Sequence, residues 1–157
     1  MSAPLDDIDS RLLAALLSDG RASATELADV AGIATSTATK RLTSLEDDSV
    51  IEGYQPEVDY AAFGYDVTAV FRLDIEGSGL AGVVEDLAAT DRMVDVYEVT
   101  GSDDVVAIGR FTDTDELNAQ IRELVTDEHV RTVTTNIVLD TVREYEHPPV
   151  VPSNERS

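Results

Sequence analysis

Cysteine and tryptophan are absent from the 157-residue chain, and lysine occurs once, at Lys40. The lack of cysteine excludes a disulfide framework and every metal site that needs thiolates. No apolar run of about 18 residues and no charged-then-apolar leader occurs, so the sequence predicts neither a membrane span nor a secretory signal. We therefore expect a cytoplasmic protein with no membrane partner.

Acidic side chains dominate the charge, because 32 aspartates and glutamates face 11 lysines and arginines, for a formal net charge of −21. Such a balance ordinarily argues against a nucleic-acid partner. The acidic residues are spread over the whole chain, however, as on surfaces adapted to molar salt. In about 1 M salt the Debye length is roughly 3 Å, so repulsion from phosphate is largely screened. We therefore interpret the acidity as an adaptation to a halophilic cytosol.

Three helices are predicted before residue 50 from apolar spacing and from capping residues. Ser23 and Glu26 have the pattern of a capping box, and Thr35 is the expected N-cap of the third helix. The predicted ranges are Asp6 to Ser18, Ser23 to Gly32, and Thr35 to about Glu46. The buried face of the third helix consists of Ala38, Leu42 and Leu45. A weakly alternating segment from Val50 to Val58 then predicts a strand or short hairpin, which would form a wing.

The second half of the chain alternates between strand and helix patterns in the order βαββαβ. Predicted strands cover Val67 to Ile75, Val94 to Thr100, Val105 to Phe111 and Val130 to Val142, and predicted helices cover Gly79 to Ala89 and Asp115 to Thr126. This order is typical of a ferredoxin-like α+β sandwich, with an antiparallel sheet and both helices on one face. The other face would expose Tyr97, Val99, Val106, Ile108 and alternate residues of the last strand. We expect that apolar surface to join two subunits through sheet faces or edges.

The predicted third helix lies in the longest part of the chain without carboxylates, because no Asp or Glu occurs from Val30 to Leu45. In a helix-turn-helix the second helix of the motif enters the major groove, where a carboxylate would repel phosphate. We expect Lys40 and Arg41 to contribute most to such binding. The full set of candidate DNA contacts is Ser36, Thr37, Thr39, Lys40, Arg41 and Thr43. The alternative is a threonine-rich surface helix that lacks acid by chance.

These residues resemble the Lrp/AsnC family of transcriptional regulators, also called leucine-responsive or feast/famine regulators, over most of the chain. The matching motifs are Leu5-Asp6-Asp7-Ile8-Asp9, Asp19-Gly20-Arg21, Glu26-Leu27-Ala28, Arg41-Leu42, Leu45-Glu46 and Val50-Ile51-Glu52-Gly53-Tyr54. Ser49 departs from the family's usual glycine, which can alter the turn into the wing. The resemblance implies a winged helix-turn-helix joined by a hinge strand to a βαββαβ ligand domain called RAM. Together with the acidity, it suggests a halophilic archaeon as the source.

The resemblance also implies that an amino-acid effector lies between subunits, near a G-x-x-D loop that joins the second and third strands of the ligand domain. Gly101, Ser102, Asp103 and Asp104 match that loop. A tight turn exposes backbone amides for a carboxylate, and Asp104 can accept from an α-ammonium group. The alternative is that Gly101 only permits a hairpin turn and that both aspartates are solvated.

No catalytic or metal-binding arrangement is evident, because His129 and His147 have no ligand or triad spacing and no Gly-rich phosphate loop occurs. We therefore expect no catalytic residue, no metal and no cofactor besides an amino-acid effector. Sirohaem decarboxylases resemble the family in both domains, but typically carry a basic pair, as in I-R-R-I-G, where this chain has Ile51-Glu52-Gly53-Tyr54. Such an enzyme and an architectural DNA-binding protein are the alternatives to a sequence-specific regulator.

The expected organisation has three parts: a winged helix-turn-helix DNA-binding domain with wing and hinge at residues 1–62, a ferredoxin-like effector-binding and oligomerisation domain at 63–146, and an extended or disordered tail at 147–157. The expected partners are double-stranded DNA with a palindromic operator, an amino acid or related metabolite, and further copies of the chain. We expect a homodimer that assembles into higher even oligomers.

Overall fold

The computed structural model describes residues 4–151, which form two units. One unit comprises the chain up to Glu57 together with the segment that begins at Arg143, and the other comprises Val58–Val142. Each unit buries a hydrophobic core of its own. Separate cores are typical of two domains.

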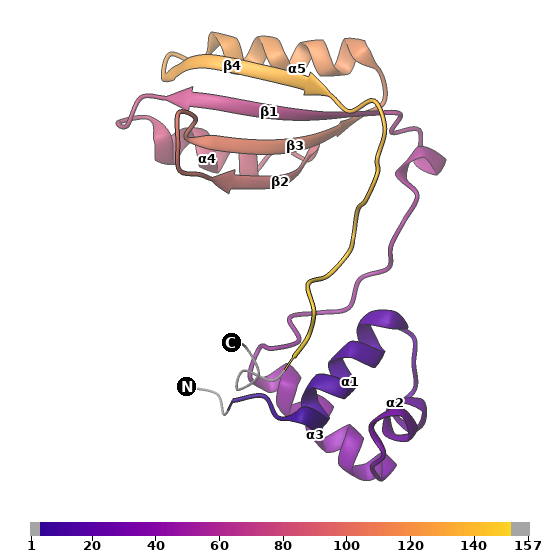
Figure 1. Cartoon of the computed structure of the whole chain (residues 1–157). Coiled ribbons are helices and arrows are strands. Elements are labelled where there is room, and N and C mark those ends of the chain that lie inside the picture. Colours follow the sequence, from indigo (N-terminus) through magenta and orange to yellow (C-terminus); the bar gives the residue numbers. More distant parts are fainter. Residues whose placement is uncertain (1–3, 152–157) are drawn as a thin grey trace. The chain divides into compact units, whose positions relative to one another are not determined.

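Three helices surround the core of the first unit (Figure 1): α1 (Asp7–Ser18), α2 (Ala24–Ala31) and α3 (Thr35–Asp47). Their most buried apolar side chains are Leu12, Leu27, Ala28, Ala31 and Ala38. The predicted capping box of α2 is confirmed, because the Glu26 N–H donates to Ser23 Oγ at 3.2 Å and the Ser23 N–H donates to Glu26 Oε2 at 2.7 Å. Gly32 ends α2 in the left-handed conformation, with a φ of 69° that favours glycine.

Two predictions for the first unit are corrected by the structure. Thr35 is not the N-cap of α3; Ala34 occupies that position, and no side chain caps the helix. The strand or hairpin expected from Val50 to Val58 is not formed within the described residues, because the segment is extended and pairs with no strand. The turn out of α3 comes at Ser49, whose φ of 57° is the left-handed conformation that glycine adopts at least cost.

The second unit is a four-stranded antiparallel sheet with the spatial order β2-β3-β1-β4. Its elements are a 3-10 turn η1 (Tyr60–Phe63), β1 (Val67–Ile75), α4 (Leu80–Ala88), β2 (Met93–Glu98), β3 (Val105–Phe111), α5 (Thr114–Thr126) and β4 (Val130–Ile137). Both helices pack on the sheet face that carries Phe71 and Phe111, whose rings meet edge to face at 6.0 Å (Figure 1). The predicted βαββαβ order and ferredoxin-like arrangement are therefore confirmed.

The last strand is shorter than the sequence indicates, because β4 ends at Ile137 and not at Val142. Val138 still donates its N–H to the Thr68 carbonyl at 2.8 Å. Since β1 begins at Val67, the residues after Val138 have no strand beside them to pair with.

The sheet face opposite the helices is only partly apolar. Register places Val70 beside Ile108, and Val106 beside Tyr97, which gives this face an apolar centre. The alternate residues of β4 on the same face were expected to be apolar, and this was wrong: they are Thr132, Thr134 and Asn136. The open face therefore has an apolar patch at Val70, Val106 and Ile108, with Arg72 beside Val106 and a polar strand at one edge.

The linker between the units is the segment between α3 and β1, and a tyrosine holds it at each end. In the first unit, Tyr54 Oη donates to Glu46 Oε1 of α3 at 3.0 Å. In the second unit, Arg92 donates to Tyr65 Oη at 2.7 Å and to Glu116 Oε1 at 2.5 Å. The Arg92 guanidinium also lies 5.0 Å from the centre of the Tyr65 ring, within range of a cation–π contact. Backbone donation from Thr112 and the bond from Arg92 hold the pKa of Glu116 below its usual value.

A close contact explains why the residue just before α4 is a glycine. A Cβ atom added to Gly79 would collide with the imidazole of His129. The two residues are held together because the Glu76 N–H donates to the His129 carbonyl, and the Gly79 N–H donates to the Glu76 carbonyl, each at 2.8 Å. Gly82, one turn further along α4, has open space where a Cβ would lie.

We predict opposite effects for alanine at these two glycines. Gly79→Ala should lower the free energy of unfolding of the second unit by roughly 1–3 kcal/mol, because the new methyl group displaces the His129 ring. Gly82→Ala should raise it by about 0.5–1 kcal/mol, because alanine favours an exposed helix interior. Urea unfolding followed by circular dichroism measures both. Equal stabilisation by the two variants would contradict the packing at Gly79.

Candidate nucleic-acid interface

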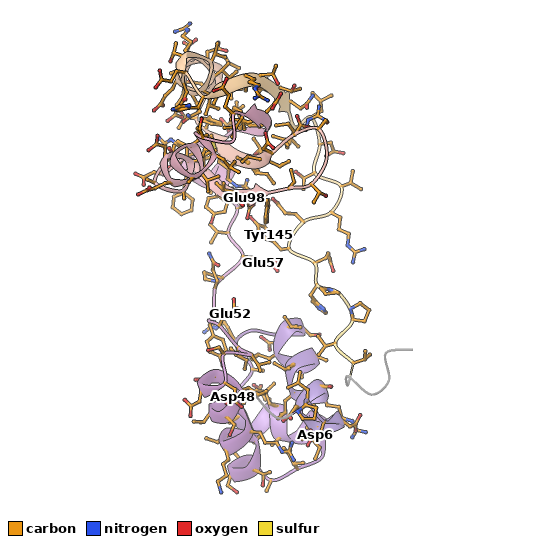
Figure 2. The ribbon with its side chains drawn as sticks, turned by 90° about the vertical axis from the view of Figure 1, so that its left-hand side faces the viewer. Asp6, Asp48, Glu52, Glu57, Glu98 and Tyr145 are labelled. Carbon is orange, nitrogen blue, oxygen red and sulfur yellow. The ribbon has the colours of Figure 1, made fainter. Side chains whose placement is uncertain are left out.

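The outer surface of α3 displays hydroxyl groups and one free ammonium group. Five of the six predicted contact residues are exposed, namely Ser36, Thr37, Thr39, Lys40 and Thr43, while Ala38 and Leu45 are buried on the opposite side of the helix. The Thr39 and Thr43 hydroxyls donate to the carbonyls four residues earlier, at 3.1 and 3.0 Å, so their oxygens remain available as acceptors. Carboxylates return in the last turn of α3, at Glu46 and Asp47, and continue after it at Asp48, Glu52 and Glu57 (Figure 2).

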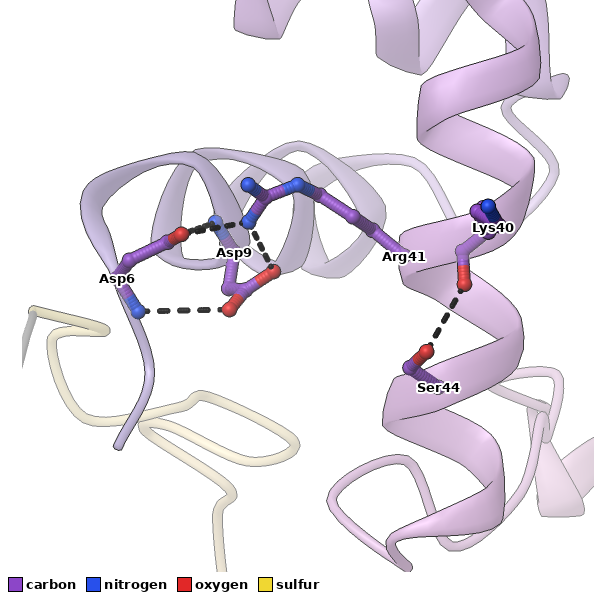
Figure 3. Close-up of polar contacts among 5 residues, drawn as sticks. All are labelled: Asp6, Asp9, Lys40, Arg41 and Ser44. Carbon is purple, nitrogen blue, oxygen red and sulfur yellow. Dashed lines mark hydrogen bonds and ion pairs between the residues drawn. The ribbon is translucent and has the colours of Figure 1, made fainter. Parts of the chain in front are cut away.

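Arg41, the sixth predicted contact, turns away from this surface. Its Nη1 atom donates to Asp6 Oδ2 at 2.6 Å and to Asp9 Oδ1 at 3.0 Å (Figure 3). The same two carboxylates form a capping box at the start of α1, in which the Asp9 N–H donates to Asp6 Oδ1 at 2.8 Å. Arg41 therefore connects α3 to the first turn of α1. Sequence reasoning missed this role, although the L-D-x-x-D motif already placed both aspartates one helical turn apart.

The charges in this network stabilise one another. Donation from the Asp9 backbone N–H, followed by the bond from Arg41, holds the pKa of Asp6 below its ordinary value of 3.8. The two aspartates in turn raise the pKa of Arg41. The guanidinium charge is thus matched by carboxylates inside the unit, which leaves little of it for an external phosphate.

Lys40 lies next to Arg41 in sequence but has no such partner. Within residues 4–151, its ammonium group forms no ion pair and no hydrogen bond, and its side chain is exposed. The Lys40 backbone carbonyl accepts from Ser44 Oγ at 3.1 Å, which is the only contact drawn to Lys40 in Figure 3. Lys40 is therefore the one cation of α3 whose charge is not already compensated.

The G-x-x-D loop joins β2 to β3 at the end of the sheet where β1 finishes. Asp104 closes this loop: its N–H donates to the Leu73 carbonyl at 2.8 Å, and its Oδ2 atom accepts from the Ile75 N–H at 2.8 Å. One oxygen of the carboxylate expected to bind an ammonium group is therefore already engaged in the fold. Gly101 has a φ of 116°, which requires glycine. Within the described chain, the backbone amides of Gly101, Ser102 and Asp103 donate no hydrogen bond.

Neither histidine forms a metal site. His129 packs against Gly79, and His147 Nδ1 lies 3.1 Å from the carbonyl oxygen of the neighbouring Pro148. Among residues 4–151, no group of three or more His, Cys, Asp or Glu side chains is arranged to hold a metal ion. No helix in that part of the chain is long and apolar enough to cross a membrane.

Comparison with known proteins assigns each unit a class. Residues 5–52 match the family model described as winged helix-turn-helix DNA-binding, and residues 68–148 match the model of the Lrp/AsnC ligand binding domain. A DNA-binding unit followed by a ligand-binding unit defines a DNA-binding transcriptional regulator. The chain belongs to the Lrp/AsnC family.

Individual relatives agree with this assignment. The HTH-type transcriptional regulator FL11 of Pyrococcus horikoshii is 31% identical over 150 residues, which cover 96% of this chain and 99% of FL11. The feast or famine regulatory protein of M. tuberculosis complexed with L-methionine is 26% identical with a TM-score of 0.82, covering 92% of this chain and 99% of that one. A Neisseria meningitidis regulator, also complexed with L-methionine, is 21% identical with a TM-score of 0.85, covering 96% and 97%, and supports the fold. The relatives are regulators, so the chain is a regulator and not a sirohaem decarboxylase.

We predict that Arg41 stabilises the first unit. Arg41→Ala should lower its free energy of unfolding by roughly 1–2 kcal/mol, because the half-exposed carboxylate of Asp6 and the largely buried carboxylate of Asp9 lose a shared partner. Arg11→Ala is the matched control: Arg11 forms one exposed pair with Asp7 at 2.6 Å, and its removal should cost less than about 0.5 kcal/mol.

The contribution of Asp6 to the stability of the first unit depends on pH with a defined sign. Because the folded-state pKa of Asp6 is lowered, its stabilising contribution is complete above the ordinary pKa of 3.8 and is lost as pH falls through the lower folded value. The difference in melting temperature between wild type and Asp6→Asn should therefore be full at pH 6 and should shrink in acid. A difference that grows as pH falls would contradict the network.

Proposed function

We propose that this regulator binds a palindromic DNA site through the α3 helices of two subunits and responds to an amino acid or a related metabolite. The observation that carries the proposal is the outer surface of α3 before its last turn, from Thr35 to Ser44, which has a free ammonium group and no carboxylate in a chain of net charge −21. In a helix-turn-helix dimer the two recognition helices are spaced about 34 Å apart, one turn of B-DNA.

The side chains of α3 have different roles in the proposed DNA recognition. Lys40 supplies the phosphate contact, because its charge is uncompensated. Arg41 acts indirectly, since its bonds to Asp6 and Asp9 set the position of α3 against α1. Base edges are contacted by hydroxyl groups, of which those of Thr39 and Thr43 act as acceptors because each already donates to a backbone carbonyl. The hydroxyl-bearing set is Ser36, Thr37, Thr39 and Thr43.

The β2–β3 loop is the proposed effector site. Three unused amides at Gly101, Ser102 and Asp103 supply donors for an α-carboxylate. Asp103 is the carboxylate that receives the ammonium group, while Asp104 holds the loop against the end of β1. Complexes of two structural neighbours with L-methionine support an amino acid as the chemical class.

The effector loop and the linker lie at opposite ends of the sheet. β1 starts beside the linker, and its last residue lies at the loop eight residues later, a span of about 26 Å at roughly 3.3 Å per residue. An effector bound at the loop is therefore too far from the linker of its own chain for direct contact. It acts instead on the relation between subunits, in a homodimer that assembles into higher even oligomers. The apolar centre of the open sheet face, with Val70, Val106 and Ile108, supports such pairing.

The working environment is a halophilic cytoplasm. The acidic surface supports this, because a net charge of −21 repels itself strongly unless salt screens it. We predict cooperative melting in 2 M KCl and loss of cooperativity in 0.1 M KCl, measured by far-UV circular dichroism. Full ellipticity and cooperative melting in 0.1 M KCl would refute the requirement for salt.

The DNA contact is tested by the salt dependence of binding. Lys40→Ala should weaken binding to operator and to non-specific DNA alike, and should reduce the slope of log K against log [salt] by about one for each bound copy. Arg122→Ala removes an exposed arginine from α5, outside the proposed interface, and serves as the control with an unchanged slope. An unchanged slope for Lys40→Ala would place the contact elsewhere.

The same titrations separate a sequence-specific regulator from an architectural protein. A regulator should prefer its operator over genomic competitor DNA by at least about 1,000-fold at the working salt concentration. An architectural protein would show no such preference.

A further inference from the structure

The chain contains 11 lysines and arginines, of which ten are arginine and one is Lys40. Both residue types provide positive charge, but only lysine carries a primary amine that an acyl group can modify. Acylation of lysine side chains in this protein therefore has a single target, and that target lies on the proposed DNA-contacting surface of α3.

The Lys40 amine is accessible to a reagent. Its side chain is exposed, and within residues 4–151 no carboxylate or carbonyl holds its ammonium group. The neighbouring Arg41 side chain leads away toward Asp6 and Asp9 (Figure 3). The nearest acidic residues in sequence are Asp29 and Glu46, which lie outside the stretch that includes Lys40.

Loss of the Lys40 charge changes the electrostatics of the outer surface of α3. Between Val30 and Leu45 the cations are Lys40 and Arg41, and Arg41 is already matched by two carboxylates. Neutralising Lys40 would leave α3 without an uncompensated positive charge and would shift the net charge of the chain from −21 to −22. A phosphate backbone would then meet an α3 surface without an uncompensated cation.

We propose that Lys40 is a reversible acylation site that switches DNA binding off, an inference that rests on the proposed DNA contact of α3. The acyl donor is a thioester. The deprotonated Nζ attacks the thioester carbonyl, a C–N bond forms as the C–S bond breaks, and the leaving thiolate takes up the proton released by the amine. Hydrolysis of the resulting amide by water returns the free amine and a carboxylic acid.

The first experiment treats the purified full-length chain with acetyl-coenzyme A and locates acetyl groups by peptide mass spectrometry. We expect acetylation of the peptide that contains Lys40, and a loss of operator affinity of roughly tenfold for each bound copy, with a salt slope lower by about one per copy. Acetylated chain that binds as tightly as untreated chain would overturn the inference. Untreated chain that binds no DNA would overturn the proposed function instead, so the two failures are distinguishable.

Two variants control for effects elsewhere on the chain. Lys40→Arg should have the same affinity before and after treatment, whatever its starting value, because it has no side-chain amine. The double variant Lys40→Arg with Arg122→Lys moves the single lysine to an exposed position on α5. Acetylation there should leave DNA affinity unchanged. A loss of affinity in either variant would show that acetylation acts through another group and would overturn the assignment to Lys40.

A second experiment examines the protein in the cells that make it. The chain is recovered in growing and starved cells, and the DNA-bound and free fractions are separated before peptide mapping. We expect acylated Lys40 in the free fraction and unmodified Lys40 in the bound fraction. If the acyl group is absent from the free and the bound fractions of both growing and starved cells, the inference is overturned, while the proposed DNA contact of Lys40 is unaffected.

Discussion

The bond from Arg41 to Asp6 and Asp9 is the contact on which the geometry of the DNA-binding unit depends. It joins the middle of α3 to the first turn of α1, at 2.6 and 3.0 Å, and it uses the same carboxylates that cap α1. It also has an electrostatic effect, because two acidic groups close to α3 are neutralised inside the unit. The outer surface of α3 from Thr35 to Ser44 can then remain free of negative charge in a chain of net charge −21.

Much of the fold follows from local patterns. Apolar spacing located all three helices of the first unit, and the pair Ser23 and Glu26 marked the start of α2 because a capping box is encoded within four residues. β1 and β3 were predicted with their observed bounds, since each combines branched apolar residues with clear alternation. The end of β4 was not predictable, because it is set by the start of β1 and not by the residues after Ile137.

The candidate sites were predictable in outline but not in detail. The candidate surface on α3 could be identified because the stretch from Val30 to Leu45 lacks Asp and Glu, a feature that can be read from the sequence without a structure. The sequence alone could not distinguish the role of Lys40 from that of Arg41, since both are cations at adjacent positions. The difference arises from a contact between residues more than thirty positions apart in the chain. Asp104 is a similar case, because its bond to the Ile75 N–H depends on where β1 ends relative to β3.

The two units have different sources of specificity. In the first, the recognition that we propose depends on α3, which an ion pair joins to α1 and whose outer surface carries short polar side chains. In the second, the loop at the end of the sheet is held by Asp104 and leaves three amides unused. The metabolite binding and the DNA binding that we propose therefore use separate elements, and in this proposal a change in one reaches the other through the assembly of subunits.

The most direct test of this account is genome-wide recovery of DNA bound to the tagged protein in cells at native salt, with and without added amino acids. The account predicts discrete palindromic sites whose occupancy changes with one amino acid. Uniform recovery of DNA without preferred sites, or no recovery at any amino-acid concentration, would contradict it.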